Sequence, residues 1–375
     1  MAHSSSNHLR DLLYSLGSKD VPEYIFQWFF RYFAGGPTLF QTEPSDMLDN
    51  YRALFSAAQI MLNHKYTQNI YRPIIADFST PSYTYYIVGD THGSFDNVFT
   101  LIDYFVRVFQ VRSDVKVVFM GDYVDRNPWD LQSLAFIIAF WLMFPENVFL
   151  LRGNHEDSSV CSRYGFSQHL YEKAGSKSRF NPVWDQANDF FSKLPIGMKA
   201  KVGDKNIIIF HGGIPFDHNN YQPVNLSDLE PHLDPFHKEH FDVDIYTQTI
   251  LWADPDIQNQ LQGEVAPTPR TGRPRFSRKA FEDFMALNQF DLLIRGHQKF
   301  PEGYRVLWDN RLISLFSTST YDGKPIGQAK FFRLTPETSV ADIGDEMTGE
   351  GKGILTIHPQ FLAAQMEHYY HARTP

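Results

Sequence analysis

Residues 85–93 read Tyr-Tyr-Ile-Val-Gly-Asp-Thr-His-Gly, a strand-length apolar run that stops at a glycine, a carboxylate and an imidazole. Its β-branched and aromatic side chains favour a buried β-strand, and the first glycine marks the end of that strand. Asp90 and His92 then stand just beyond the strand's carboxyl end. Ligands of open α/β sheets gather at that position. This stretch therefore predicts an α/β fold together with the place of a functional site.

Four further apolar runs of strand length follow the same pattern downstream. Each of them ends in glycine or in a polar side chain that can bind a metal ion. These polar side chains are Asp122, Asn154, His155, His211 and His297. Because ligands collect at the carboxyl ends of the strands in such sheets, we expect these side chains to lie near Asp90.

Segments with helical periodicity separate the first of these strands. Apolar residues recur at helical spacing over residues 95–109 and 131–141, and alternation of strand and helix is typical of α/β proteins. Two later candidate strands, at 312–316 and 330–334, have no long helix between them. We therefore expect part of the sheet structure to be antiparallel.

The two ends of the chain differ from this central pattern. Asp20 can cap a helix whose apolar face holds the aromatic residues of 25–33, and a second apolar stripe runs over residues 48–62. We expect residues 1–82 to be a helical N-terminal extension that packs on the core. Docking of a regulatory protein is the alternative role for these helices. Residues 336–375 are expected to form a C-terminal tail with a short helix.

The composition limits the classes of protein to consider. Apolar residues make up 43% of the 375 residues and charged residues 21%, so a large core can form. A formal net charge of −9 argues against a nucleic-acid-binding protein. The longest apolar run, 134–144, is too short to span a membrane, and Cys161 is the single cysteine. We expect a soluble enzyme of the reducing cytoplasm, with delivery of a bacterial protein into a host cell left open.

The predicted site offers oxygen and imidazole ligands and no thiolate. This set suits manganese, iron or zinc in a hydrolytic centre and does not suit a structural zinc site. Asp122 is the natural bridge between two ions, because each of its oxygens can bind one. Arg126 indicates an oxyanion substrate, since the planar guanidinium matches the geometry of phosphate. Two metals and an arginine clamp predict hydrolysis of a phosphate ester.

Five motifs resemble, in the same order, those of the PPP family of metal-dependent phosphoprotein phosphatases, a branch of the calcineurin-like metallophosphoesterases. They are Gly-Asp-Thr-His-Gly at 89–93, Gly-Asp-Tyr-Val-Asp-Arg at 121–126, Leu-Arg-Gly-Asn-His-Glu at 151–156, His-Gly-Gly at 211–213 and Arg-Gly-His-Gln at 295–298. The resemblance covers about residues 83–335 and implies that this segment is the catalytic domain. It also implies a central β-sandwich of mixed sheets flanked by α-helices.

The resemblance implies a site for two divalent metal ions, with manganese expected and iron or zinc also compatible. It assigns one ion to Asp90, His92 and Asp122. It assigns the second ion to Asp122, Asn154, His211 and His297.

For the substrate, the resemblance implies contacts from Arg126, Asn154, Arg270 and Tyr321. Arg270 follows from an ungapped count back from His297, and Arg273 is the alternate residue for the same role. His155 resembles the general acid of the family, and Asp125 resembles the carboxylate that orients it. The site therefore has an expected set of binding and proton-transfer residues.

The function implied by the resemblance is hydrolysis of phosphoserine and phosphothreonine in proteins by a metal-bridging hydroxide. Three departures from the family surround the substrate: Asn127 stands in place of Gly, Ser319-Thr320 in place of Pro-Asn, and Asp322 in place of Cys. They leave phosphotyrosine or dual specificity open. The motifs are also compatible with a bis(nucleoside) polyphosphate hydrolase on the same fold. An inactive binding scaffold is the remaining possibility, and it would lack a metal ligand or an arginine clamp.

Overall fold

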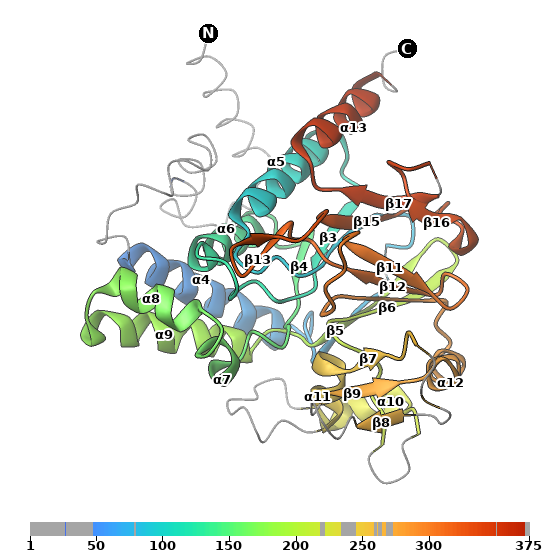
Figure 1. The fold of residues 1–375 in the computed structure, drawn as a ribbon, viewed down its shortest axis with the longest axis horizontal. Coiled ribbons are helices and arrows are strands. Elements are labelled where there is room, and N and C mark those ends of the chain that lie inside the picture. Colours follow the sequence, from blue (N-terminus) through green and yellow to red (C-terminus); the bar gives the residue numbers. More distant parts are fainter. Residues whose placement is uncertain are drawn as a thin grey trace.

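The computed structural model describes residue 27 and residues 48–78, 80–217, 222–233, 245–258, 261, 265–267, 273–349 and 351–371. The helix expected after Asp20 lies outside these ranges apart from Gln27, and Arg270 lies outside them as well. Over the described residues, α/β architecture is confirmed, with two large sheets between layers of helix (Figure 1).

One six-stranded sheet of the described residues, called the β2 sheet below, has the order β16-β17-β15-β2-β3-β4. Its strands are β16 (Ile343–Asp345), β17 (Lys352–Thr356), β15 (Lys330–Leu334), β2 (Thr84–Val88), β3 (Val115–Phe119) and β4 (Val148–Leu150). Strands β2, β3 and β4 are parallel, whereas β15 is antiparallel to both of its neighbours. The expected antiparallel part of the sheet structure is therefore present.

A second six-stranded sheet within the described ranges, called the β6 sheet, has the order β1-β5-β6-β10-β12-β11. Its strands are β1 (Ile74–Asp77), β5 (Gly197–Val202), β6 (Lys205–Phe210), β10 (Leu292–Arg295), β12 (Leu312–Leu315) and β11 (Tyr304–Leu307). Strands β6, β10 and β12 are parallel, and β5 and β11 run antiparallel to their neighbours β6 and β12. Both sheets are thus mixed.

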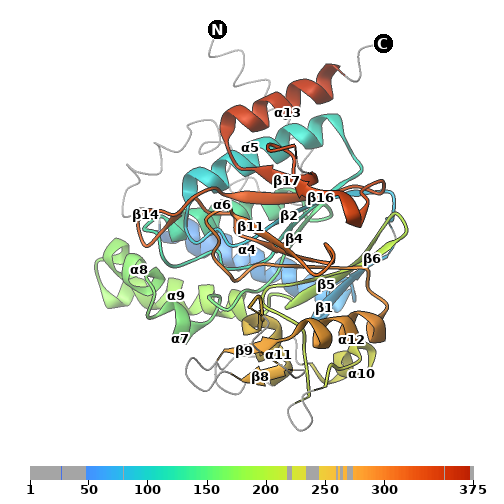
Figure 2. The same cartoon turned by 45° about the vertical axis from the view of Figure 1, so that its right-hand side comes forward.

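The alternation of side chains along β6 shows how the layers are stacked. Ile207 and Ile209 belong to the large core that they share with residues of the β2 sheet. Ile208 and Phe210 point to the opposite face and join the smaller core with helix α12 (Arg278–Asn288). The two sheets therefore face each other as a sandwich, with α12 outside the β6 sheet (Figure 2).

Helices α5 (Phe95–Val111) and α6 (Asp130–Met143) cover the outer face of the β2 sheet. The ring of Phe105 on α5 lies 5.5 Å from that of Tyr86 on β2 and 6.3 Å from that of Phe140 on α6. All residues of α6 are buried, which explains its nearly uniform apolar sequence. Both predicted central helices are therefore confirmed, and the mixed sandwich flanked by helices is the fold.

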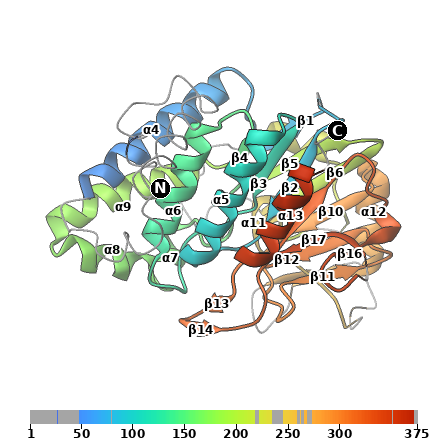
Figure 3. The same cartoon turned by 90° about the horizontal axis from the view of Figure 1, so that it is seen from above.

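Helix α4 (Leu48–Thr67) confirms the second stripe of the N-terminal region. Its buried side chains include Leu48, Tyr51, Phe55, Ala58 and Leu62. The helix packs against α6 and α9 (Lys177–Ser192), next to α8 (Phe166–Ala174), at the side of the molecule seen in Figure 3. The ring of Phe55 lies 6.1 Å from that of Phe190 on α9.

Apart from the C-terminal helix, the remaining described elements are short. They are α7 (Ser158–Cys161), α10 (Leu226–Leu229), the 3-10 turns η2 (Glu230–His232) and η3 (Val340–Asp342), α11 (Ile245–Trp252), the strands β7 (Asp254–Pro255), β8 (Val265–Pro267) and β9 (Pro274–Phe276), and the hairpin β13 (Thr320–Tyr321) with β14 (Lys324–Pro325). Strands β7, β9 and β8 pair as a small sheet.

The chain beyond residue 335 contributes to the sandwich. Strand β17 pairs with β15 inside the β2 sheet, and α13 (Pro359–His371) packs on α5. Within the expected C-terminal tail, strand β17 begins with Lys352 and Gly353. The domain limits at 82 and 335 remain predictions. Among the described helices, none is both long and apolar enough to cross a membrane.

Candidate metal centre and active site

The six expected metal ligands meet at the carboxyl ends of strands from both sheets. The β2 sheet supplies Asp90, His92, Asp122 and Asn154, and the β6 sheet supplies His211 and His297. Their side chains are buried. An isolated bridge between Asp90 and Phe316 joins the two sheets at the same place. The sandwich therefore holds this group of residues between its layers.

The carboxylate of Asp122 lies in the middle of the group. Its Oδ2 atom is 3.5 Å from Nε2 of His92, and its Oδ1 atom is 3.3 Å from Nε2 of His211. Asp90 Oδ2 lies 3.8 Å from Nε2 of His92 on the first side. On the second side, the amide oxygen of Asn154 lies 2.9 Å from Nε2 of His211 and 2.7 Å from Nδ1 of His297. Asp122 thus connects two sets of donor atoms.

Two buried polar atoms of this group lack a hydrogen-bond partner in the described part of the chain, namely Oδ2 of Asp90 and Nε2 of His297. Leaving such atoms unsatisfied is costly, so both call for a ligand. Burial and the charge of Asp122 raise the pKa of Asp90 to about 7. A cation would relieve this crowding of carboxylates. The donor set and its unsatisfied atoms therefore fit divalent metal ions.

The backbone around the centre is held in a conformation that non-glycine residues seldom adopt. The φ angles are +41° at His92, +54° at Asp122 and +70° at His297. Asp125 and Arg126 also have positive φ angles, of +71° and +73°. Such strain persists only where the surroundings fix it, and it is common at functional sites. The clustering of these angles at one place is a structural sign of a site.

Hydrogen bonds fix the imidazole rings of the ligands. Nδ1 of His92 lies 2.9 Å from the carbonyl oxygen of Val124, and Nδ1 of His211 lies 3.0 Å from that of Met120. A carbonyl only accepts, so Nδ1 donates in both rings, and Nε2 is the ring nitrogen left on the side of Asp122 where a metal ion would bind. Burial lowers the pKa of His92 to about 3, which keeps this ring neutral and able to bind a metal.

Glu156 and Arg295 hold the backbone next to the metal ligands by hydrogen bonds. The sequence alone does not predict either role. Glu156 accepts hydrogen bonds from the backbone N–H groups of Asp122 and Gly153, at 2.6 and 2.8 Å. The fully buried Arg295 donates to Asp254 Oδ1 at 2.9 Å and to the carbonyl of Gly212. Both residues belong to the five sequence motifs, so the sequence indicates that they matter but does not indicate which groups they contact.

His155 lies at the edge of the metal centre and pairs with Asp125. Its Nδ1 is 2.6 Å from Asp125 Oδ2, and Asp125 Oδ1 accepts the backbone N–H of Phe166 at 2.9 Å. Burial alone would lower the pKa of His155, but the charge of Asp122 and the bond to Asp125 outweigh burial, so the pKa is raised. The ring also forms a possible ligand group with His92 and Asp122. The pairing with Asp125 leaves Nε2 for a substrate or an ion.

Arg126 is clamped between two aromatic rings. Its guanidinium carbon is 4.1 Å from the ring centre of Tyr164 and 4.9 Å from that of Tyr321. Nη1 lies 3.6 Å from Oδ1 of Asp322, while Nε is buried without a hydrogen-bond partner among the described residues. Lys299 lies over the same Tyr321 ring at 4.6 Å. This is a pre-positioned cation suited to an anionic group.

Of the two arginines considered for the second phosphate contact, only Arg273 lies in the described residues. Its guanidinium is 5.7 Å from the ring of Trp252, and that ring lies 5.7 Å from the imidazole of His297. Arg273 is therefore near the second set of donors. The structure brings together every other expected site residue: Asp90, His92, Asp122, Asp125, Arg126, Asn154, His155, His211, His297 and Tyr321.

Comparison with known proteins agrees with this geometry. The profile described as calcineurin-like phosphoesterase matches residues 83–300. A probable serine/threonine-protein phosphatase of Encephalitozoon cuniculi is 30% identical over 256 residues, which are 68% of this chain and 51% of that protein. The chain thus spans about half the length of this relative.

The fold also matches a solved structure. A protein serine/threonine phosphatase of Saccharomyces cerevisiae, with similarity to human phosphatase PP5, aligns with a TM-score of 0.65 and 22% identity over 82% of this chain and 88% of that one. At this identity the match shows the fold alone. The profile match covers the five motifs and both sets of donors, and it confirms the resemblance drawn from the motifs. The chain belongs to the calcineurin-like phosphoesterase family.

Proposed function

We propose that this metallophosphoesterase is a protein phosphatase that hydrolyses phosphoserine and phosphothreonine monoesters. The observation that carries the proposal is the His155–Asp125 pair, 2.6 Å apart, placed at the edge of the two donor sets that share Asp122. A serine or threonine alkoxide is a poor leaving group and requires a proton donor there. The relative from Encephalitozoon cuniculi, described as a probable serine/threonine-protein phosphatase, supports the same substrate class.

The metal ions would be held as the sequence predicts. One would bind Asp90, His92 and Asp122, and the other Asp122, Asn154, His211 and His297. When bound, the ions lower the pKa of water and neutralise charge on the phosphoryl oxygens. Manganese is the ion we expect in the purified protein.

The side chains of the protein would bind the phosphoryl group and protonate the leaving oxygen. Arg126, fixed between Tyr164 and Tyr321, binds the phosphoryl oxygens and sets their orientation. Asp125 holds the imidazole of His155 through Nδ1 and favours its protonated form. Nε2 of His155 then delivers a proton to the serine or threonine oxygen as it leaves.

The presence of all expected ligands and of Arg126 supports an active enzyme. An inactive binding scaffold would lack a metal ligand or an arginine clamp, whereas all six expected ligands and Arg126 lie together in the described structure. The packing of α4 on α9 and α6 supports the first expectation for its part of residues 1–82, namely an extension that packs on the core. Regulatory docking and a cytoplasmic location stay predictions.

A substrate panel tests the proposal. The purified chain is assayed with Mn²⁺ on one peptide carrying phosphoserine, phosphothreonine or phosphotyrosine, and on diadenosine tetraphosphate. We expect the highest kcat/KM with the first two substrates. Preferred turnover of phosphotyrosine or of the dinucleotide would replace the proposed substrate class, and absence of any turnover with two bound ions would refute an enzymatic role.

A further inference from the structure

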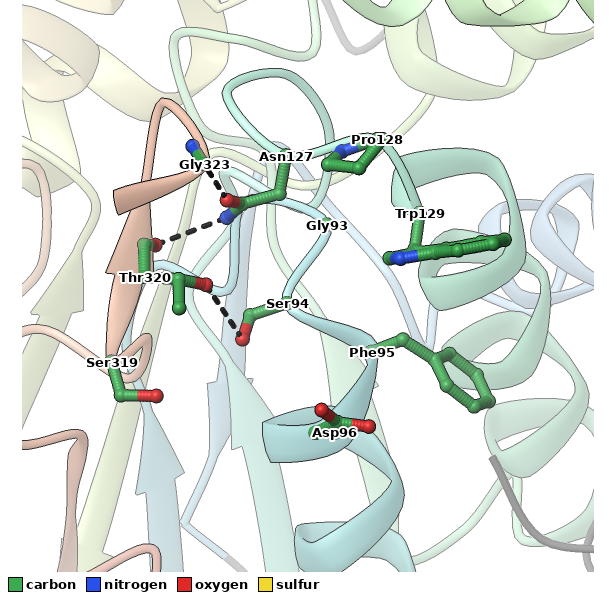
Figure 4. A pocket seen from close by; sticks show the side chains of 10 residues that line it. All are labelled: Gly93, Ser94, Phe95, Asp96, Asn127, Pro128, Trp129, Ser319, Thr320 and Gly323. Atoms are coloured by element: carbon green, nitrogen blue, oxygen red, sulfur yellow. Dashed lines mark hydrogen bonds between the residues drawn. The ribbon is translucent and has the colours of Figure 1, made fainter. Parts of the chain in front are cut away.

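A cavity of about 280 Å³ is lined by residues outside the metal centre, and Figure 4 shows their side chains. The start of helix α5, the loop after Arg126 and the β13–β14 hairpin enclose it. Ser94 and Thr320 lie on one side of it and Phe95 and Trp129 on the other, and the exposed Asp96 lies at the lower end in Figure 4. None of these residues belongs to the metal centre described above.

The cavity adjoins the proposed phosphate site along the chain. Asn127, in its wall, directly follows Arg126, and Thr320 directly precedes Tyr321. An extended peptide advances about 3.3–3.6 Å per residue. A substrate whose phosphoryl group contacts Arg126 therefore has a neighbouring side chain within reach of the cavity. Its volume is below the ~300–1,000 Å³ typical of small-molecule sites, so one side chain suits it better than a separate ligand.

The walls of the cavity are held by hydrogen bonds. The amide nitrogen of the buried Asn127 donates to the carbonyl oxygens of His92 at 2.7 Å and Thr320 at 3.0 Å. Asn97 Oδ1 accepts from the hydroxyls of Ser94 at 2.6 Å and Ser319 at 2.9 Å. These bonds tie the hairpin to α5 and to the loop after Arg126, so the cavity is formed before a substrate binds.

The negative charge of Asp96 in the cavity favours a cationic occupant. Asp96 is the single charged residue that lines it, and its exposed carboxylate forms no hydrogen bond or ion pair within the described residues. The positive end of the α5 dipole amounts to about half a charge and offsets only part of this negative charge. The half-buried ring of Trp129, with the edge of the nearly buried Phe95 beside it, offers an apolar and π surface that a long cationic side chain can cover.

We propose that this cavity binds the side chain of an arginine or lysine that lies within two or three residues of the phosphorylated residue in the substrate. The inference rests on the proposed function, because it deepens the substrate class of the same site. The methylene groups of the basic side chain pack on Trp129 and Phe95, and its cationic end meets Asp96. The site is thereby selective for phosphopeptides with a basic flanking residue.

Binding of matched peptides tests this without depending on turnover. A non-hydrolysable phosphonate analogue of phosphoserine is placed in peptides that carry either arginine or its neutral analogue citrulline, at each position from −3 to +3. Dissociation constants are measured by calorimetry with the Mn²⁺-loaded protein. At one or two positions we expect the arginine peptide to bind about three- to tenfold more tightly than the citrulline peptide, the range of an exposed ion pair plus a cation–π contact.

Asp96→Asn should bring that ratio close to one. The matched control is Asp103→Asn, two turns further along α5, where the carboxylate pairs with Arg107 at 2.9 Å, and it should keep the wild-type ratio. Equal binding of all arginine and citrulline pairs, no binding of either peptide, or a ratio that survives in Asp96→Asn would overturn the inference. Turnover of the ordinary phosphoserine peptides is assayed in parallel, so loss of the proposed function is seen separately from loss of this selectivity.

Discussion

At the residue scale, Asp122 is the position where the two sets of donors meet. Its two oxygens lie 3.5 and 3.3 Å from Nε2 of His92 and of His211, respectively. Histidine neighbours hold its pKa well below the ordinary value in spite of its burial, so the carboxylate is charged. It also accepts the backbone N–H of His155 at 2.9 Å. One side chain thus links both proposed ions and the proposed general acid.

We expect Asp122→Asn to cost more metal and more activity than Asn154→Ala. The first change removes the negative charge shared by both proposed ions, whereas Asn154 contacts only the second set of donors. Metal content per chain is measured by elemental analysis, and kcat on an aryl phosphate is measured in parallel. A larger loss of metal in Asn154→Ala would contradict a bridging role for Asp122.

His155→Gln should slow hydrolysis of a phosphoserine peptide by about 10²–10⁴-fold and affect para-nitrophenyl phosphate far less. The aryl leaving group departs without a proton, whereas the serine alkoxide needs one. Kinetics on both substrates and the metal content are measured together.

The matched control for His155 is Arg126→Ala, which should weaken both substrates to a similar degree because both present the same phosphoryl group. If His155→Gln slows both substrates equally, or removes a metal ion, then His155 is a ligand of the centre rather than its acid. The grouping of His155 with His92 and Asp122 makes this a real alternative to test.

At the element scale, the β13–β14 hairpin carries Tyr321 and Asp322 and is attached to the centre by Asn127. Asn127→Ala would leave the buried carbonyl oxygen of His92 without this donor, at a cost of about 1–3 kcal/mol in the free energy of unfolding, and would remove one of the donors to the half-buried carbonyl of Thr320. We also expect a higher KM for phosphopeptides, because Tyr321 and Arg126 lose their alignment. Urea denaturation and steady-state kinetics measure the two effects.

Asn147→Ala serves as the control for the hairpin. Asn147 likewise donates to a carbonyl oxygen, that of Val115 at 2.8 Å, but at the start of strand β4. It should lower stability without raising KM. An unchanged KM in Asn127→Ala would show that the hairpin stays in place without this side chain.

A second link between elements should make stability depend on pH. The bond of His169 on α8 to Asp130 at the start of α6 measures 3.0 Å, and it raises the pKa of His169 above its ordinary 6.5. A raised pKa means that the folded state holds the proton more tightly than the unfolded chain. This stabilisation is complete below about pH 6.5 and is lost as the pH rises through the higher folded-state pKa.

His169→Gln should remove that contribution, so its deficit in stability relative to wild type should be larger at pH 5.5 than at pH 8.5. Urea midpoints at both pH values measure the difference. His64→Gln, at an exposed position of α4, is the matched control and should follow the wild-type profile. A deficit in His169→Gln that is equal at both pH values would assign the contact to packing rather than to charge.

At the scale of the whole molecule, local sequence was a good guide to the strands and a poor one to their partners. The apolar run 85–88 stands out because both faces of β2 are buried, and each ligand follows directly on such a run. The pairing of β17 with β15 was not foreseen, because the glycines around residue 352 resemble a turn until a neighbouring strand pairs with them. The roles of Asn127 and Arg295 likewise depend on distant carbonyl and carboxylate groups.

The distribution of ligands over the two sheets has a consequence for the stability of the whole fold. The β2 sheet supplies Asp90, His92, Asp122 and Asn154, and the β6 sheet supplies His211 and His297. An ion that binds Asp122 and His211 together therefore joins the two layers of the sandwich. Without it, the buried carboxylates of Asp90 and Asp122 lie close together, and the charge of Asp122 together with burial raises the pKa of Asp90.

We expect removal of metal by a chelator to lower the Tm by several degrees and added Mn²⁺ to restore it, since a ligand at 100 times its Kd stabilises the folded state by about 2.7 kcal/mol per site. Metal binding should slow hydrogen exchange at the carboxyl end of β3 in the β2 sheet. It should also slow exchange at the carboxyl ends of β6 and β10 in the β6 sheet, because the ions bind residues of both sheets. His297→Gln removes a ligand of the second ion alone, so it should keep one ion per chain and lose roughly half of the Tm gain, on an equal share per site. Protection confined to β3, or a full Tm gain in His297→Gln, would mean that the metal does not join the sheets.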